Sequence, residues 1–473
     1  MTSPIIHLSD SGEPVVSAPF FVRGEVVEGA DVIQKSRDLG VTFATPAIPF
    51  DKAIPPRTEV PPLLNVPVSE IIDFLVETGQ RLVAPDNPYI HECFERMAST
   101  HILPREVVEN VSKHAVAYLD RRILQAEVDQ SFPDPGALDG WVERQDFTGR
   151  RGRVRAYAPR LIHVLPGNSP GVAIKSIAQG ALVKAFNLFK MSSADPFYTV
   201  AILRTMADLD PNHPIVRSMS AVYWRGGDAA VENVLYRPQY FDKIVAWGGG
   251  DAINNVVKYL GPGFQLVSFD PKTSISMIGQ EALESEERME EVASKAASDL
   301  MMLNQEACAA SRFQFVEGPQ DLVDRFCAKF QRNIAERAAI SGDIRPLAPD
   351  LKEEVEALMM MDDEFGTWGR SDGKGLVIRS EEPVDFHPIN KIGNVVRVDR
   401  LDVAVKYVNV ATQTIGFYPS GRMADYRDRL GAGGAQRVCP LGEAGPSTVG
   451  MPWDGMYPLH RFVNWMVNEE GVG

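Results

Sequence analysis

Cysteine is scarce in this chain of 473 residues, which has only four: Cys93, Cys308, Cys327 and Cys439. None of them belongs to a CxxC pair or shares the short Cys/His spacing of a zinc site. Neither a disulfide framework nor a structural metal is therefore indicated. Cysteines used in this way are typical of a reducing compartment, and we expect a cytoplasmic protein.

Long apolar runs are also absent. The first residues, Met1 to Pro4, lack the basic start and apolar stretch of a signal peptide, and no segment approaches the roughly 20 apolar residues that cross a bilayer. We therefore expect no membrane span. The net charge of −15 favours solubility and argues against general nucleic-acid binding. The patterns GxGxxG and GxxxxGK(S/T) do not occur, which excludes the standard Rossmann fingerprint and the P-loop.

Residues 153–269 alternate short apolar strands with helical segments of about ten residues. This order predicts βαβ units and a parallel sheet, so the expected fold class is α/β. At 52.1 kDa and 44% hydrophobic residues, the chain is large enough to bury more than one core. The expected strands are 161–165, 185–190, 220–224, 241–247 and 265–269, with helices at 172–183, 196–209 and 251–259.

Segments outside this region have weaker patterns. Residues 20–27 predict a hairpin that turns at Arg23-Gly24, and apolar spacings of three and four predict helices between about 68 and 127. The glycine-rich residues 431–434 predict a flexible loop. Residues 453–467 predict a loop and then an amphipathic helix, with Leu459, Phe462, Val463 and Met466 on its apolar face.

Four loops follow predicted strands and contain residues suited to phosphate. In parallel sheets ligands bind beyond the carboxyl ends of the strands. Glycine lets a backbone approach a pyrophosphate, and a helix N-terminus offers N–H groups and a positive dipole. Each loop alone fits a tight turn equally well, but four at one edge favour a nucleotide. The loops are 166–170 (PGNSP), 190–193 (KMSS), 225–228 (RGGD) and 248–251 (GGGD).

Cys308 lies where a nucleophile is expected, between a charged helical run at about 281–302 and a strand pattern at 312–316. The alanines on either side of it leave room for a substrate. This arrangement indicates covalent catalysis through a thiolate. The alternative is a small buried hydrophobe, which is the usual state of a free cysteine.

In this order the motifs resemble the aldehyde dehydrogenase superfamily and, within it, the acyl-CoA reductase family typified by LuxC. The resemblance extends over about residues 20–465. The segments that carry it are 163–170 (HVLPGNSP), 210–214 (DPNHP), 246–249 (AWGG), 304–308 (NQEAC), 437–442 (RVCPLG) and 453–455 (WDG), with Lys190 and Lys272 after two of the strands.

The resemblance implies an aldehyde dehydrogenase-like fold, with a Rossmann-type cofactor domain and an α/β catalytic domain. An N-terminal arm with helices is expected over 1–152 and the dinucleotide-binding domain over 153–273. The thiol-bearing catalytic domain is expected over 274–436. The last segment, 437–473, is expected to return to the cofactor cleft or to an oligomer interface.

The resemblance also implies catalytic roles. Cys308 matches the nucleophile of the superfamily. Asn168 matches the asparagine of its Pro-Trp-Asn motif, which donates to the oxyanion together with the Cys308 backbone N–H. Ser268 stands where hydrolytic members have a general-base glutamate, so an acyl-enzyme is expected to survive until a thiol or a hydride reaches it. Gly167 replaces the tryptophan of the motif, which suggests space for a long acyl group.

For the cofactor, Lys190 matches the lysine that reaches the adenosine ribose of a nicotinamide dinucleotide. Ser192 and Ser193 follow it and are candidates to bond a 2′-phosphate, which favours NADPH, with NADH as the alternative. No metal is implied. The remaining expected cofactor contacts are Gly226, Gly227, Gly248 and Gly249.

Three other residues have two interpretations each. His163 is expected to be a core histidine, with a proton relay as the alternative. Glu306, two residues from the thiol, is a candidate base. Arg437 either contacts the cofactor ribose or only stabilises the fold.

The resulting prediction is NADPH-dependent reduction of an acyl thioester, on CoA or on a partner protein, to the aldehyde through an acyl-enzyme on Cys308. Two alternatives stay open: a cysteine-dependent acyltransferase or thioesterase without hydride transfer, and a non-catalytic subunit of a fatty-acid reductase complex. By resemblance to the superfamily we also expect a homo-oligomer.

Overall fold

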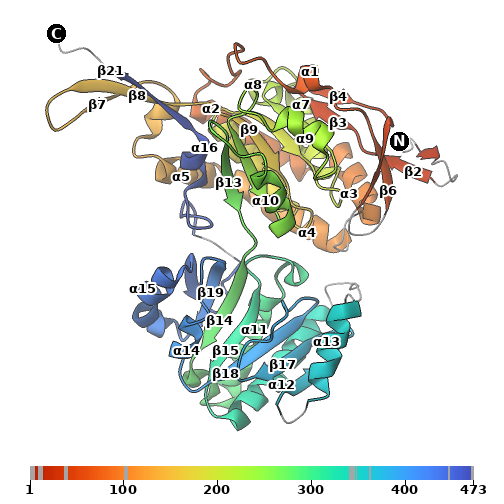
Figure 1. Ribbon diagram of the computed structural model, residues 1–473, viewed down its shortest axis with the longest axis vertical. Helices are drawn as coiled ribbons and strands as arrows, with labels where there is room; N and C mark the ends of the chain where they lie inside the picture. Colours follow the sequence, from red (N-terminus) through yellow and green to blue (C-terminus); the bar gives the residue numbers. More distant parts are fainter. Residues whose placement is uncertain are drawn as a thin grey trace. The chain divides into compact units, whose positions relative to one another are not determined.

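The structure, a computed structural model, describes residues 6–8, 14–36, 41–100, 105–339, 347, 349–361, 364–445 and 448–469. The chain forms two compact units (Figure 1). Unit 1 consists of Met1–Asp270 together with Val449–Gly473, and unit 2 of Pro271–Thr448. The C-terminal segment therefore packs with the N-terminal part of the chain. Within the described ranges, no helix has both the length and the apolar character that crossing a bilayer requires.

Unit 1 is built on a seven-stranded sheet in the order β13-β12-β9-β10-β11-β3-β4. The five strands predicted at 161–269 are all present and parallel to one another, and the predicted hairpin at 20–27 adds two antiparallel strands at one edge. The bounds are β3 (Phe20–Val22), β4 (Glu25–Val27), β9 (Arg160–Val164), β10 (Phe186–Lys190), β11 (Met219–Val222), β12 (Lys243–Trp247) and β13 (Gln265–Phe269).

The order of these strands creates a point where the chain changes direction. From β9 it runs through α6 (Gly171–Leu182) to β10, and through α7 (Tyr198–Leu209) to β11. It then crosses back through α9 (Ala229–Leu235) to β12, which pairs with the other side of β9. Ligands bind at such switch points, here between the carboxyl ends of β9 and β12.

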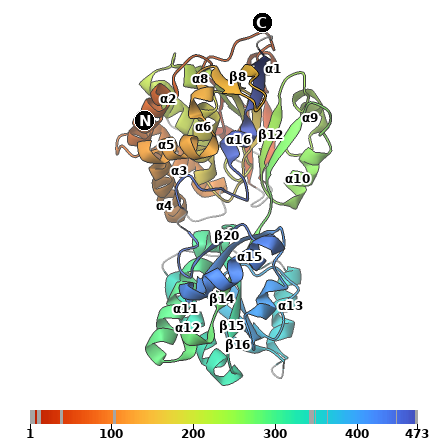
Figure 2. The ribbon, with the colours of Figure 1, turned by 90° about the vertical axis from the view of Figure 1, so that its left-hand side faces the viewer.

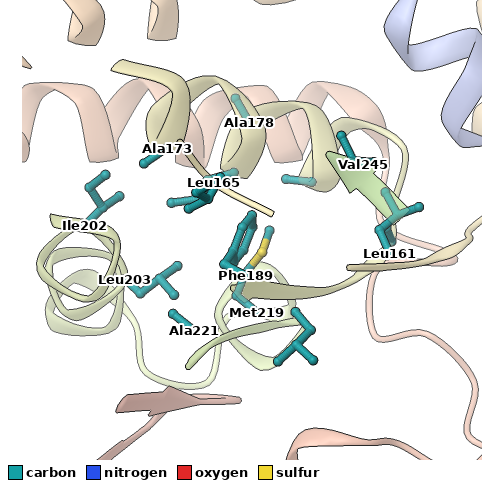
Figure 3. Close-up of a cluster of buried hydrophobic side chains, with 14 of the residues drawn as sticks. Leu161, Leu165, Ala173, Ala178, Phe189, Ile202, Leu203, Met219, Ala221 and Val245 are labelled. Atoms are coloured by element: carbon teal, nitrogen blue, oxygen red, sulfur yellow. The ribbon is translucent and has the colours of Figure 1, made fainter. Parts of the chain in front are cut away.

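The interior of unit 1 is apolar on both sides of its parallel strands. Leu161, Phe189 and Val245 from the strands pack with Ala178 of α6 and Leu203 of α7, and all five are at most 1% exposed (Figure 3). The sequence of a strand that is buried on both faces is a nearly continuous run of apolar residues. The positions of these parallel strands could therefore be predicted from the sequence.

The remaining elements of unit 1 surround this sheet, and the helices predicted between 68 and 127 are confirmed. One small sheet has the order β1-β2-β6-β5 and another the order β21-β8-β7. The bounds are β1 (Ile6–Leu8), β2 (Pro14–Ser17), β5 (Val32–Lys35), β6 (Thr42–Thr45), α1 (Phe50–Ala53), α2 (Val68–Leu82), α3 (Pro88–Thr100), α4 (Arg105–Val116), η1 (Ala117–Leu119), α5 (Arg121–Ser131), η2 (Pro135–Leu138), β7 (Val142–Gln145), β8 (Arg151–Tyr157), α8 (Pro214–Arg217), α10 (Gly250–Val257), α16 (Pro458–Phe462) and β21 (Asn464–Glu469).

The prediction of an amphipathic helix within residues 453–467 is largely wrong. Only Pro458–Phe462 is helical, and Asn464–Glu469 forms strand β21, which pairs antiparallel with β8. Met466, expected on the apolar helix face, is 50% exposed in this strand. Pairing with β8 satisfies the backbone of these residues and overrides their helical spacing.

Unit 2 contains a second seven-stranded sheet, in the order β16-β17-β18-β15-β14-β19-β20. Only β16 is antiparallel to its neighbour. The bounds are β14 (Thr273–Ile278), η3 (Gln280–Leu283), α11 (Glu286–Leu300), η4 (Met302–Gln305), β15 (Ser311–Glu317), α12 (Gln320–Ala338), α13 (Pro349–Met359), β16 (Gly366–Gly369), β17 (Leu376–Ser380), β18 (Ile392–Val398), α14 (Asp402–Val405), β19 (Thr412–Tyr418), η5 (Ser420–Arg422), α15 (Met423–Gly433) and β20 (Arg437–Pro440).

The glycine-rich residues 431–434, predicted as a flexible loop, instead end helix α15. Gly434 adopts the left-handed conformation with φ 115°, and its N–H donates to Gly431 O. A Cβ there would lie 2.6 Å from the backbone of Asn409 and Val410, so glycine is required by both conformation and packing.

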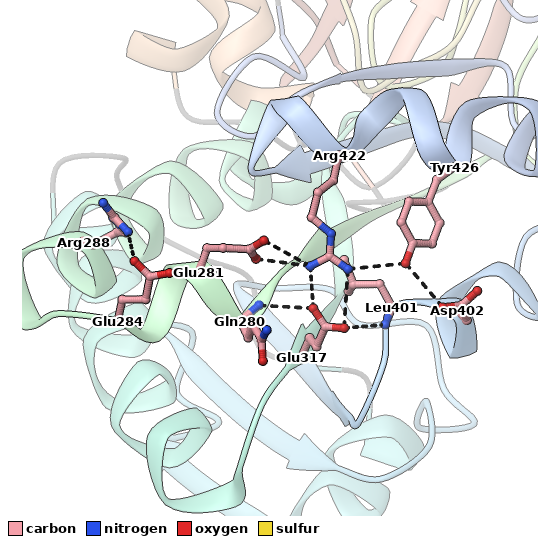
Figure 4. A network of polar contacts seen from close by, with 9 residues as sticks. All are labelled: Gln280, Glu281, Glu284, Arg288, Glu317, Leu401, Asp402, Arg422 and Tyr426. Atoms are coloured by element: carbon pink, nitrogen blue, oxygen red, sulfur yellow. Dashed lines mark hydrogen bonds and ion pairs between the residues drawn. The ribbon is translucent and has the colours of Figure 1, made fainter.

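A polar network joins the elements at the carboxyl end of β15 (Figure 4). The Glu317 carboxylate accepts from Arg422 Nη1 at 2.6 Å and from the backbone N–H groups of Gln280 and Leu401. Arg422 also pairs with Glu281 at 3.2 Å. This network stabilises the end of the unit 2 sheet where β15 finishes. Cys308 lies at the opposite end, just before β15 begins.

Candidate active site

The sequence-predicted cofactor residues gather at one edge of unit 1, beyond the carboxyl ends of β9, β10, β11 and β12. Asn168 lies between β9 and α6 and is half-buried. Lys190 is the last residue of β10, which pairs with both β9 and β11. Glycines 248 and 249 follow β12 directly and precede α10. Parallel pairing brings these loops to the same edge of the sheet.

Gly167 is needed for close packing, and the expectation that it makes space for an acyl group is wrong. A Cβ at this position would lie 2.5 Å from Ser192 Oγ and 2.9 Å from the Ala194 Cβ. The space beside Asn168 that a side chain would occupy is therefore already filled by the loop after β10. Only glycine lets the two loops approach this closely.

Lys190 and the two serines have different surroundings. Lys190 Nζ lies 5.4 Å from the centre of the Trp224 ring, within cation–π range. Ser192 Oγ accepts from Ala194 N at 3.3 Å and faces Gly167. Ser193 hydrogen-bonds Tyr223, whose phenol has its pKa raised by burial. Both serines therefore help to shape the loop.

Several glycines of these loops have no packing reason to be glycine. A Cβ at Gly226, Gly249 or Gly250 would meet no atom within 4 Å. Gly227 has φ 85°, a conformation that favours glycine in its own right. Backbone open on the outer side is what a bound pyrophosphate requires, so these positions fit a dinucleotide better than they fit a packing role.

Glu232, which sequence reasoning missed, links the loop after β11 to helix α10. It is 0% exposed, and its Oε1 accepts from Gly227 N at 3.0 Å and from Trp224 Nε1 at 3.3 Å. Asn255 Nδ2 of α10 donates to both of its oxygens, at 2.9 and 3.0 Å. Figure 2 shows α9 and α10 on the same side of β12. The sequence analysis predicts no helix over residues 229–235, so it offered no signal for a buried carboxylate there.

Cys308 lies in unit 2, between η4 and β15, and is the exposed one of the four cysteines. Cys93, Cys327 and Cys439 are buried. Burial raises the pKa of the Cys439 thiol to about 11, and it raises the pKa values of the Cys93 and Cys327 thiols well above their usual value. Cys308 is thus accessible to a substrate, whereas the other three are structural.

Side chains of the neighbouring strands β14 and β19 contact Cys308. Ser274 Oγ of β14 donates to the Cys308 carbonyl at 2.8 Å and fixes the backbone there. Gln413 Nε2 of β19 donates to the Cys308 sulfur at 3.1 Å. Sequence reasoning missed both, because each lies far from Cys308 in the chain and in a strand rather than in a motif.

The turn that precedes Cys308 is strained. Leu303, Asn304 and Gln305 all have positive φ, at 48°, 57° and 69°, and each such non-glycine residue costs about 1–2 kcal/mol. The Gln305 side chain holds the turn by accepting from Lys391 N at 2.6 Å and donating to Ile392 O at 2.6 Å. A strained turn held this firmly is typical of a functional site.

Arg312 supports the same turn from the other side. Its guanidinium is 5% exposed and donates to Gln305 O and Pro388 O, each at 2.6 Å. Burial lowers its pKa, while attraction to Glu306 and to Cys308 acts in the opposite direction. Glu306 is half-buried and contributes its charge to this cluster.

The two remaining candidates, His163 and Arg437, form contacts that stabilise the fold. His163 is 0% exposed, its Nε2 lies 2.9 Å from Asn187 Oδ1, and burial lowers its pKa to about 4. It is a neutral core histidine, as predicted. Arg437 donates to Ala444 O at 2.6 Å and to Glu443 O at 2.8 Å, and so stabilises the turn after β20.

Comparisons with known proteins agree with this architecture. The model of a family described as acyl-CoA reductase (LuxC) matches residues 63–465. A long-chain acyl-protein thioester reductase from Vibrio harveyi is 28% identical over 421 residues, which cover 86% of this chain and 84% of the relative.

Solved structures confirm the predicted aldehyde dehydrogenase-like fold. Lactaldehyde dehydrogenase from Escherichia coli superposes with a TM-score of 0.71 at 14% identity, covering 96% of this chain and 99% of that one. NADP-dependent glyceraldehyde-3-phosphate dehydrogenase from Bacillus halodurans C-125, solved in complex with NADP, gives a TM-score of 0.70 at 14% identity. It covers 97% of this chain and 100% of its own.

Proposed function

The chain belongs to the acyl-CoA reductase (LuxC) family, and from this premise we propose that it reduces an acyl thioester to the aldehyde with NADPH. The observation that carries the proposal is the single exposed cysteine, Cys308, inside the segment that matches the family. The name of the Vibrio harveyi relative supports an acyl group held as a thioester on a protein, and the description of the family supports an acyl group on CoA.

In the proposed reaction the Cys308 thiolate attacks the thioester carbonyl. A C–S bond forms to Cys308, and the original thiol leaves. The Asn168 amide and the Cys308 backbone N–H stabilise the oxyanion of the tetrahedral intermediate. Ser268 offers no carboxylate to activate water, so the new thioester on Cys308 persists until it is reduced.

NADPH, when bound, supplies the hydride that reduces the thioester carbonyl on Cys308. The loops at the edge of the unit 1 sheet fit this group, because the glycines 226 and 249 leave backbone open that packing does not use. We assign Lys190, at the end of β10, to the adenosine ribose. Positions 192 and 193 are serines rather than carboxylates, which would repel a 2′-phosphate, and this supports NADPH over NADH.

We expect Glu232→Gln to raise the dissociation constant of NADPH about tenfold, equivalent to the loss of about 1.4 kcal/mol. The substituted amide keeps the size of the side chain but turns an N–H group toward Gly227 or Asn255, which are themselves donors. The loop after β11 and helix α10 then lose their common acceptor. Quenching of Trp224 fluorescence during NADPH titration measures the change.

Asn233→Gln is the matched control for Glu232, because Asn233 is an exposed residue of the same helix. It should bind NADPH as the unmodified chain does. Unchanged affinity in a folded Glu232→Gln protein contradicts the role given to this carboxylate.

The proposed function is tested by following absorbance at about 340 nm with NADPH, with NADH and with a long-chain acyl-CoA. The absorbance should fall only when acyl thioester is present, and aldehyde should form in equal amount. Release of free thiol without loss of absorbance instead indicates an acyltransferase or thioesterase. An unchanged intact mass and no turnover with any thioester indicate a non-catalytic subunit.

Partner and compartment are further parts of the proposal. We propose that an acylated protein or acyl-CoA delivers the substrate, and that the chain forms a homo-oligomer. The sheet of β7, β8 and β21 supports the latter, because β21 exposes Trp465 and Met466 and the connection between β7 and β8 exposes Phe147. The four free thiols support a reducing, cytoplasmic setting.

A further inference from the structure

The amide of Gln413 is aimed at the sulfur of Cys308. Nε2 lies 3.1 Å from Sγ, although the two residues are 105 positions apart in the chain. Gln413 is the second residue of β19 and is 5% exposed, whereas Cys308 is exposed. A nearly buried donor on a rigid strand thus points at an accessible nucleophile, which is the arrangement that a preorganised catalytic group needs.

The neighbours of Gln413 fix the orientation of its amide. Thr414 Oγ1 donates to Gln413 Oε1 at 3.5 Å, which occupies the oxygen and leaves the NH₂ group for the sulfur. Thr414 N donates to Ser274 Oγ at 3.1 Å, and the same hydroxyl donates to the Cys308 carbonyl at 2.8 Å. Ser274 therefore couples the strand that carries Gln413 to the backbone of the nucleophile.

The local charge favours negative charge on the sulfur. The buried Arg312 guanidinium attracts Cys308, and it donates to the backbone carbonyls of Pro388 and Gln305. Glu306 also acts on Arg312, and its negative charge opposes a thiolate. His387 faces Arg312 as well, and burial together with the Arg312 charge lowers its pKa to about 4. Positive charge held close to the thiol strengthens a hydrogen bond to a thiolate.

We propose that Gln413 is a catalytic residue whose amide donates to the Cys308 sulfur whenever that sulfur carries negative charge. It does so before the thiolate attacks the thioester. It does so again after hydride addition, when the alkoxide electron pair forms the aldehyde carbonyl and the C–S bond pair returns to sulfur. This role rests on the proposed function, yet it can be tested without substrate or NADPH.

The test compares Gln413→Met and Gln413→Glu with the unmodified chain in the rate of Cys308 alkylation by iodoacetamide from about pH 6 to 10. Methionine keeps the length of the side chain but donates nothing, so the alkylation midpoint should rise by about one pH unit and the rate at pH 7 should fall about tenfold. Glutamate places a like charge beside the sulfur and should lower the rate further.

Cys308→Ala measures the background from the three buried thiols, and Thr414→Val provides a second route to the same answer. In Thr414→Val the Gln413 amide loses its hydrogen bond from Thr414 and can rotate. The pH midpoint of Cys308 alkylation should therefore rise by less than it does in Gln413→Met. An unchanged alkylation profile in the folded variants overturns the proposal. A shifted profile in a protein that never oxidises NADPH would keep the role of Gln413 and reject the reductase, so the two failures are distinguishable.

Discussion

Cys308→Ala is expected to abolish both acylation and turnover, with NADPH oxidation falling by more than about 10³-fold. Alanine removes the nucleophile and leaves a side chain that the exposed turn accommodates. No other thiol can replace it, because Cys93, Cys327 and Cys439 are buried and burial raises the pKa of each. Intact-mass measurement after incubation with a long-chain acyl-CoA should show an adduct only in the unmodified chain.

Cys439→Ala is the matched control, since Cys439 belongs to the same unit but is 6% exposed at the edge of its sheet. It should keep the acyl adduct and most of the turnover. An adduct of normal stoichiometry on Cys308→Ala would show that another side chain is acylated. Normal turnover in this variant would exclude the covalent mechanism.

Much of unit 1 could be predicted because its signal is local. Strands β9 (Arg160–Val164) and β12 (Lys243–Trp247) stand out as apolar runs that precede glycine-bearing loops, and every residue of both strands is buried. The loops at the carboxyl ends follow from the parallel topology. Local pattern and global fold agree in this part of the chain.

Prediction failed where distant segments decide the structure. Residues 464–469 have helical spacing but pair with β8, more than 300 positions earlier, because that pairing satisfies their backbone. Glu232 and Gln413 act through contacts with other loops and strands, and the sequence around each is unremarkable to a motif search. The left-handed turn Leu303–Gln305 contains no glycine to mark it. It exists because Lys391 and Arg312 hold it.

The residues proposed to carry out the chemistry are divided between the two units. The nucleophile and the donor to its sulfur belong to unit 2, so the reactivity of Cys308 can be studied by alkylation alone. The proposed oxyanion donor, Asn168, and the proposed cofactor loops belong to unit 1. Variants of the proposed cofactor loops are therefore expected to change turnover with NADPH, whereas the Gln413 variants should change the alkylation rate of Cys308 without NADPH.

Asn168→Ala is expected to lower kcat by about 10²–10³-fold with a much smaller change in KM. The side-chain amide is proposed to donate to the oxyanion, which exists only in the intermediate, so its loss affects the barrier more than substrate binding. Steady-state kinetics with acyl-CoA and NADPH separate the two constants. Rapid quenching with labelled acyl-CoA should show that acyl transfer to Cys308 is slowed by a comparable factor.

Two variants sharpen this prediction. Asn168→Asp has almost the same size but presents a carboxylate to the oxyanion, so its kcat should fall below that of Asn168→Ala. Ser169→Ala changes the next residue of the loop, which has no proposed role in catalysis, and should retain most of the activity. If Asn168→Asp and Asn168→Ala instead raise KM and leave kcat intact, Asn168 binds the substrate in its ground state and the oxyanion role is lost.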